Sequence, residues 1–278
     1  MSVIDLTSSV AYSSLSLAIS GSSAGDVIQL SPGLYNENFP SITHTLTIQS
    51  SGGLAHLVNP QPVPLNGRAV LNVPGGLGLN LTISGLEISG AVDNQTPYPN
   101  GAGILFETGN GVLTVNNSWI HNNQDGILVG GTPGTSVVVS HSEFNNNGNV
   151  EGAAGSGYPH NIYVGAVDSL TITDSYFHDA VAGHEIKSLA YQTTITDSRI
   201  QDQQLGGGSS AIDLAYGGTG LIANNVIEQG VNAANRYSIT FAENKTYSVT
   251  GLTVSDNIFV ADRPGGTTAL YNASNASR

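Results

Sequence analysis

The segment His184-Glu185-Ile186-Lys187-Ser188 concentrates side chains that could perform acid–base chemistry. Histidine, glutamate and lysine are common general acids and bases, and Lys187 is one of only two lysines in the 278-residue chain. Neighbouring side chains of a β-strand point to opposite faces. If Ile186 points inward, Glu185 and Lys187 should therefore point to solvent. The segment is the first candidate for a catalytic or binding site.

Ile186 belongs to a series of isoleucines that recurs along the chain. The series consists of Ile104, Ile127, Ile162, Ile186, Ile212 and Ile239, and its five steps average about 27 residues. A second series, at the ends of neighbouring apolar runs, consists of Ser118, Ser142, Ser175, Ser198, Asn225 and Asn257. A period near 27 in a sequence rich in Val, Ile and Thr predicts a β-solenoid. Each coil should hold three short strands, with the isoleucines stacked in one core column and the Ser/Asn series at a tight turn.

The segment 24–37 reads as a strand, a Pro-Gly turn and a second strand. This segment resembles the entry of pectate-lyase-like proteins. The coil pattern over most of residues 24–260 resembles the right-handed parallel β-helix of pectate lyases, polygalacturonases, alginate epimerases and phage tailspikes. The segments 157–165 and 183–188 look like a signature shared by bacterial β-helix proteins of unassigned activity. The resemblance implies the fold, a polysaccharide as partner and a secreted or cell-surface location.

No catalytic residue follows from the resemblance. The Asn-Thr-Asp, Asp-Asp and Gly-His-Gly motifs of the hydrolase branch do not match, and neither does the Asp-Pro-His motif of the mannuronan epimerases. We expect one all-β domain over residues 1–278. It should consist of an N-terminal cap over residues 1–23 with a short helix within residues 8–20, about ten coils over 24–260, and a C-terminal end at 261–278.

Composition limits the partners. The chain has 7 Lys and Arg against 20 Asp and Glu, a net charge of −13, which argues against nucleic acid. The same charge disfavours an anionic polymer unless a cation such as Ca²⁺ intervenes. There is no cysteine, and no apolar run approaches the ~20 residues of a membrane-spanning helix. The first residues show no signal-peptide pattern.

Stacking the coils brings further polar residues beside the first segment. One coil back, Asn161 should lie beside Glu185 and Tyr163 beside Lys187; one coil forward, Asp213 should lie beside Lys187. We therefore expect these five side chains to share one solvent-facing surface.

The residues just before these strands form a second column, Asp125, His160, His184 and Ser210. His160 and His184 could act as general base and acid, or could share a metal ion with Asp125. Alternatively, they form a stacked, hydrogen-bonded pair that closes a corner of the solenoid. The other histidines, His121 and His178 on an ordinary solvated face and His44, His56 and His141 without partners, suggest no site.

Two insertions should rise beside the expected surface. The segment 147–158 ends at Tyr158, and the segment 91–102 contains Tyr98. Long loops on a rigid scaffold often carry binding residues, so both tyrosines are candidate substrate contacts beside a trough. The alternative is that the two loops are unrelated surface excursions.

Three functions fit these residues. The first is a uronate-polysaccharide lyase or C5-epimerase, in which Lys187 or His184 takes a proton, Tyr163 or His160 supplies one, and Asn161 holds the carboxylate. The second is an inverting glycoside hydrolase with Glu185 and Asp213 about 8 Å apart. The third is a non-catalytic carbohydrate-binding or adhesive rod, in which the charged residues form a surface ion-pair ladder.

Overall fold

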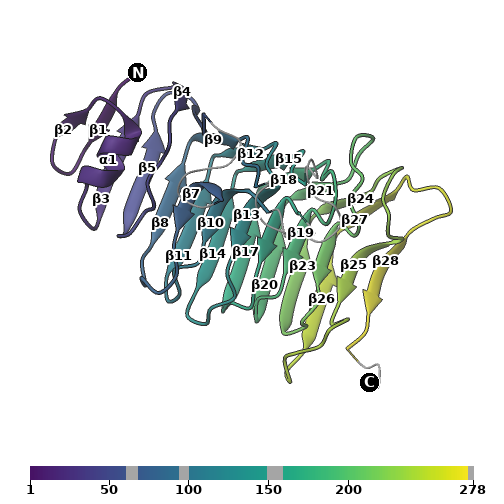
Figure 1. Ribbon diagram of the computed structural model, residues 1–278. Coiled ribbons are helices and arrows are strands. Elements are labelled where there is room, and N and C mark those ends of the chain that lie inside the picture. Colours follow the sequence, from purple (N-terminus) through teal and green to yellow (C-terminus); the bar gives the residue numbers. More distant parts are fainter. Residues whose placement is uncertain (61–67, 94–99, 149–158, 275–278) are drawn as a thin grey trace.

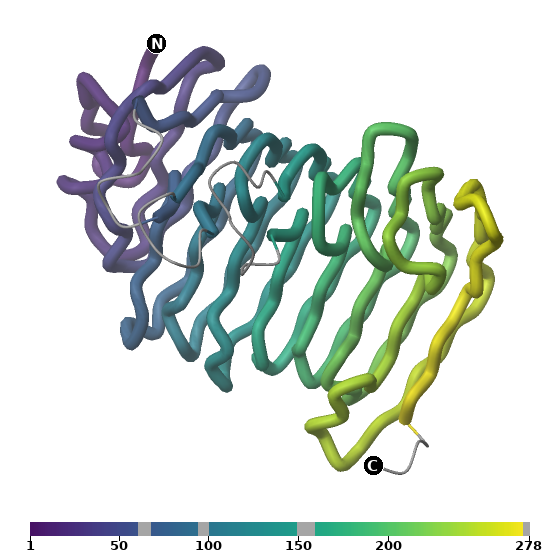
Figure 2. The backbone as a smooth tube through the Cα atoms, turned by 45° about the vertical axis from the view of Figure 1, so that its right-hand side comes forward, coloured from purple at the N-terminus to yellow at the C-terminus, as the bar shows by residue number. Residues whose placement is uncertain are grey.

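The computed structural model describes residues 1–60, 68–93, 100–148 and 159–274. Strands follow one another around the core and stack along one axis from the N-terminal to the C-terminal end (Figures 1 and 2). They form three sheets, called A, B and C. From the second coil onward each coil passes through them in that order, whereas the first coil contributes strands to sheets A and B only. All neighbouring strands within the coils pair in parallel, as expected for a right-handed parallel β-helix.

The strands of sheet A are β1 (Val3–Asp5), β2 (Val10–Tyr12), β3 (Asp26–Leu30), β5 (Leu46–Ser50), β8 (Leu81–Ser84), β11 (Val112–Asn116), β14 (Ser136–Ser140), β17 (Ser169–Thr173), β20 (Gln192–Thr196), β23 (Thr219–Ala223) and β26 (Gly251–Ser255). The strands of sheet B are β4 (Gly33–Asn36), β6 (Ala55–Val58), β9 (Leu86–Ser89), β12 (Trp119–His121), β15 (Glu143–Asn145), β18 (Tyr176–His178), β21 (Arg199–Gln201), β24 (Val226–Gln229) and β27 (Ile258–Ala261). The strands of sheet C are β7 (Ala69–Val73), β10 (Ala102–Phe106), β13 (Asp125–Val129), β16 (Ile162–Val164), β19 (Ile186–Ser188), β22 (Ile212–Leu214), β25 (Tyr237–Phe241) and β28 (Thr268–Asn272). Sheet B has nine strands, one from each coil, so the described residues form nine coils. The strand β28 extends the last coil past residue 260.

The predicted isoleucine column is confirmed. Each member pairs with the next across sheet C, from Ile104 to Ile239, and all are fully buried. Sheet B contributes a parallel column in which the rings of Phe144 and Phe177 stack with centroids 4.5 Å apart. Branched and aromatic side chains in register thus fill the interior, because each coil repeats the packing of the one before.

The Ser/Asn series forms the expected turn ladder between sheets A and B. The backbone N–H of Ser118 donates to Ser142 Oγ (3.1 Å), and the same bond recurs down to Asn225 N–H and Asn257 Oδ1 (2.9 Å). The residue just before each ladder residue has a positive φ, as at Asp174 (48°) and Asn224 (59°). Asn and Asp tolerate this left-handed conformation, which explains the polar residue at each bend.

The N-terminal cap differs in detail from the expectation. The helix α1 (Leu15–Gly21) begins later than residue 8 and has Ser14 as its N-cap, while part of the expected helical segment forms β2. The strand β1 pairs antiparallel with both β2 and β3, which covers the first edge of sheet A. Within the described residues, we find no helix long and apolar enough to cross a bilayer.

Candidate active site on sheet C

Tyr163, Lys187 and Asp213 stand side by side on the outer face of sheet C, as the register predicted. Lys187 Nζ donates to Asp213 Oδ2 (2.5 Å), and Thr240 Oγ1 donates to Asp213 Oδ1 (2.8 Å). Asp213 is nearly buried, whereas the side chain of Lys187 is 22% exposed. A buried carboxylate therefore fixes an ammonium group on this face.

Asn161 and Glu185 do not lie on that face, so this part of the prediction is wrong. Both are buried, at 0% and 1% exposure, and Asn161 Nδ2 donates to Glu185 Oε2 inside the solenoid. Asn147 Nδ2 donates to Asn161 Oδ1 (2.8 Å), and the N–H of Ala180 donates to Glu185 Oε1 (2.8 Å). These side chains satisfy backbone groups at the corner between sheets B and C.

The error has a physical cause. The strands β16 and β19 begin at Ile162 and Ile186, so Asn161 and Glu185 precede them at a bend. Alternation of faces holds only within a strand, and the bend turns both side chains inward. An exposed Glu185 paired with Asp213 was the basis of the inverting hydrolase, and this basis is lost.

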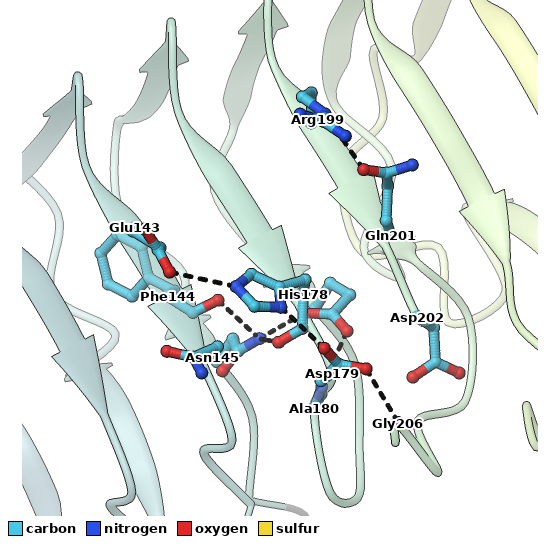
Figure 3. A network of polar contacts seen from close by, with 12 residues as sticks. Glu143, Phe144, Asn145, His178, Asp179, Ala180, Arg199, Gln201, Asp202 and Gly206 are labelled. Carbon is cyan, nitrogen blue, oxygen red and sulfur yellow. Dashed lines mark hydrogen bonds and ion pairs between the residues drawn. The ribbon is translucent and has the colours of Figure 1, made fainter. Parts of the chain in front are cut away.

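The environment of Glu185 favours its neutral form. Burial raises its pKa well above the ordinary value of 4.5, and the nearby carboxyl group of Asp202 raises it further. Asp202 is also buried, which raises its own pKa to about 7. Figure 3 shows this corner, where Asp179 accepts from the N–H of Gly206 (3.1 Å). The acidic residues here form an internal network behind the outer face.

The column Asp125, His160, His184 and Ser210 forms a ladder of hydrogen bonds. In each step, the side chain of one residue accepts a bond from the backbone N–H of the next residue in the column. The N–H of His160 donates to Asp125 Oδ1 (3.0 Å), and the N–H of His184 donates to His160 Nδ1 (2.9 Å). His184 Nδ1 lies 3.2 Å from the N–H nitrogen and 3.0 Å from the carbonyl oxygen of Ser210. The imidazole rings of His160 and His184 stack with centroids 5.3 Å apart. The stacked, hydrogen-bonded pair is thus the observed arrangement.

This ladder contradicts the possible metal site at Asp125. A ring nitrogen that accepts a hydrogen bond from a backbone N–H has no free lone pair for an ion, and His160 Nδ1 is engaged in this way. The proton of the neutral His160 ring must then lie on Nε2, which makes that atom a donor. Among the described residues, His and carboxylate donor atoms do not converge at Asp125.

Burial shifts the protonation of the ladder. Burial lowers the pKa of His160 well below 6.5, and the adjacent His184 and Lys187 lower it further. Burial also lowers the pKa of His184, against the opposing effect of Asp213. In contrast, burial raises the pKa of Asp125 to about 7, although Arg68 and the His160 N–H oppose the shift. A carboxyl group that titrates near neutrality is suited to proton transfer.

Two cavities lie along this side of the solenoid and share Lys187. The first, the Asp125 cavity, has a volume of about 660 Å³, and its lining includes Arg68, Asp125, His160, Tyr163, Lys187 and Tyr216. The second, the Asp213 cavity, has a volume of about 490 Å³, and its lining includes His184, Lys187, Asp213, Thr240 and Glu243. Lys187 therefore stands where two hollows meet.

Arg68 and Tyr216 were missed from sequence. Arg68 follows the segment 51–67, whose sequence is rich in Gly and Pro and offers no repeat to fix the register. Its guanidinium donates to Asn100 Oδ1 (3.0 Å) and lies 3.5 Å from Glu107. Tyr98 and Tyr158 lie outside the residues that the structure describes. A calcium ion needs ~6–8 oxygen ligands, and the carboxylates lining the described part of the Asp125 cavity are only Glu107 and Asp125. These residues do not fit a calcium site.

Comparison with known proteins supports the fold. No family model and no curated protein matches the chain. The crystal structure of pectate lyase Pel9A matches with a TM-score of 0.53 and 13% sequence identity, over 96% of this chain and 75% of that chain. The chain therefore has the pectate-lyase-like right-handed parallel β-helix fold, as the coil pattern predicted. At this identity the likeness concerns the fold alone.

Proposed function

We propose that the chain is a polysaccharide lyase, or a C5-epimerase, that binds a uronate residue in the Asp125 cavity. One observation carries the proposal. Two of the seven Lys and Arg residues of a chain with net charge −13, Arg68 and Lys187, line the same cavity as a carboxyl group whose pKa is raised to about 7. Cations that neutralise a substrate carboxylate beside a base are what proton abstraction from a uronate requires.

In this mechanism Asp125 removes the proton beside the uronate carboxylate. Lys187 and Arg68 stabilise the negative charge that develops on the carboxylate oxygens as that C–H bond breaks. For cleavage, the glycosidic oxygen leaves and takes a proton from Tyr163, whose phenol stays protonated because burial raises its pKa above 10.0. For epimerisation, a proton returns to the opposite face of the same carbon, and its donor is Tyr163 or His160, which both line the cavity.

These roles differ from those proposed from sequence alone. Lys187 Nζ donates to Asp213 at 2.5 Å, which holds the ammonium group at the cavity. An ammonium group has no lone pair, so it is suited to binding the carboxylate rather than taking a proton. Asn161 is buried and bonded to Glu185, so it cannot hold the substrate. His184 Nε2 lies 3.5 Å from Asp213 and serves to position that carboxylate. A polysaccharide substrate would place the protein outside the cell or at its surface.

The test is incubation with a panel of acidic and neutral polysaccharides. Ultraviolet absorbance detects the unsaturated product of a lyase, reducing-end assays detect cleavage, and NMR detects C5 inversion. We expect absorbance with new reducing ends on a uronate polymer. Asp125→Asn and Lys187→Met should reduce turnover by at least about 100-fold, the scale of a lost catalytic group.

Lys245→Met is the matched control, because Lys245 is the other lysine and its Nζ bonds the Ser274 carbonyl instead of a cavity residue. It should keep full turnover. Reducing ends without absorbance would indicate a hydrolase and reject the proposal. Binding to a polysaccharide without any product would reject it in favour of a non-catalytic carbohydrate-binding rod.

A further inference from the structure

Three side chains with metal-binding atoms meet on the outer face of sheet B, apart from the candidate active site. His56 on β6, Glu87 on β9 and His121 on β12 come from three successive coils; His56 pairs with Glu87, and His121 pairs with Ser89. One donor atom of each lies within 4.8 Å of the others. In the described part of the chain, no other group of His and carboxylate donors converges in this way.

The separations suit a small tetrahedral ion. Glu87 Oε1 lies 3.5 Å from His56 Nδ1 and 3.1 Å from His121 Nε2. With metal–ligand bonds of ~2.0–2.2 Å, neighbouring ligands of a tetrahedral zinc ion lie about 3.3 Å apart. Two of the three distances between ligand atoms are thus already close to the required value. Rotation of the His56 side chain, which is 29% exposed, can shorten the third distance, between the ring nitrogens of His56 and His121.

The remaining ring nitrogens have partners that can orient the ligands. His56 Nε2 lies 2.8 Å from Ser89 Oγ, which leaves Nδ1 for an ion. His121 Nδ1 lies 2.7 Å from the side-chain amide of Asn122, and rotation of this amide by half a turn presents its oxygen as the acceptor for an Nδ1 proton. Such hydrogen bonds commonly fix the tautomer of metal-bound histidines.

We propose that His56, Glu87 and His121 bind a zinc ion that links three successive coils. Two imidazoles and one carboxylate form a known zinc ligand set, with the fourth position open to water. The side chains are 29%, 21% and 10% exposed, so an ion can reach them from solvent. The ion neutralises Glu87 and joins strands that otherwise depend on backbone hydrogen bonds and core packing.

Two coils later, the same face contains a similar pair of residues that can be compared with this cluster. Glu143 and His178 repeat the diagonal of Glu87 and His121, with His178 Nε2 3.2 Å from Glu143 Oε1 (Figure 3). The position of His56 is occupied there by Trp119, which pairs with Glu143. His178 Nδ1 is taken by Asp179 (2.7 Å). This second pair therefore lacks a third ligand and should not bind zinc tightly.

The test is zinc titration of the whole metal-free chain by isothermal titration calorimetry. Wild type should bind one equivalent, and His56→Ala and Glu87→Gln should each weaken affinity by at least about 100-fold, beyond the ~10–100-fold of an outer partner. His178→Ala, the matched control, should bind as wild type does. Thermal unfolding without zinc shows whether each variant is folded.

Cobalt supplies an independent readout. Trp119 is the sole tryptophan, and its ring stacks on His121 with centroids 3.9 Å apart, so Co²⁺ at this site should quench the fluorescence and show visible absorption of a tetrahedral ion. His56→Ala should abolish both signals. Wild type that binds zinc no more tightly than His56→Ala, or equal loss in His178→Ala, would overturn the proposal and leave a hydrogen-bonded cluster.

Discussion

Replacement of Glu185 by glutamine should change how stability depends on pH. Glu185 is 1% exposed, and its two carboxyl oxygens accept from Asn161 Nδ2 and from the N–H of Ala180. Glutamine has one oxygen and one NH₂ group, so one of these donors loses its acceptor. This loss should destabilise Glu185→Gln by ~1–3 kcal/mol when the wild-type carboxyl group is neutral.

The wild-type advantage should disappear as the pH rises. The pKa of Glu185 is raised in the folded state above 4.5, so its contribution is fully present below pH 4.5 and is lost as pH rises toward the folded pKa. Each pH unit in this window costs about 1.4 kcal/mol, because the unfolded chain has released the proton and the folded chain has not. The wild type should therefore lose stability relative to Glu185→Gln as the pH rises from 5 to 7.

The assay is urea unfolding at pH 5, 6 and 7, followed by circular dichroism. We expect the stability advantage of wild type over Glu185→Gln to be largest at pH 5 and to shrink at pH 6 and again at pH 7. Glu143→Gln on the outer face of sheet B, with the Glu143 side chain 47% exposed, is the control and should stay within ~0.5 kcal/mol of wild type. A wild-type advantage over Glu185→Gln that is constant across the three pH values would refute the reasoning.

Three further predictions concern packing and catalysis. Phe177→Ala should lower the free energy of unfolding by ~3–5 kcal/mol, because the fully buried ring stacks on Phe144; a loss under ~1 kcal/mol in denaturant titration would contradict this packing. Gly126→Ala should cost ~1–3 kcal/mol in the same assay, because a Cβ there would clash with the carbonyl oxygen of Asn161; an unchanged midpoint would contradict this clash. If Asp125 is the base, kcat/KM should rise with pH through about 7 and then level off; a flat profile from pH 5 to 9 would assign the base elsewhere.

The fold could be predicted from the sequence because each coil repeats the same core packing. Isoleucines about 27 residues apart can share one buried column only if the chain returns to the same position once per coil. The register that follows from this column placed Tyr163 beside Lys187 and Lys187 beside Asp213, as observed. The outer part of the candidate site was therefore predictable.

The direction of side chains at bends was not predictable in the same way. Asn161 and Glu185 precede three-residue strands, where alternation no longer decides the face. The meeting of His56, Glu87 and His121 was missed for another reason. His56 itself lies in the sequence 51–78, which is rich in Gly and Pro, so the register between β6 and β9 had no repeat to fix it.

The outer column of sheet C imposes discrete spacings on any molecule that lies along it. Each strand of sheet C contributes one residue to this column, which runs Asn72, Leu105, Leu128, Tyr163, Lys187, Asp213, Thr240 and Tyr271. Neighbouring positions are one strand apart, about 4.8 Å. Inserting one whole coil between β13 and β16 would move Asp125 away from Lys187 by a further ~4.8 Å, and a residue of the new coil would replace His160 as the neighbour of Asp125. The length of a ligand that fits along this column can therefore change in steps of one coil. Gain or loss of one coil would change which ligand fits.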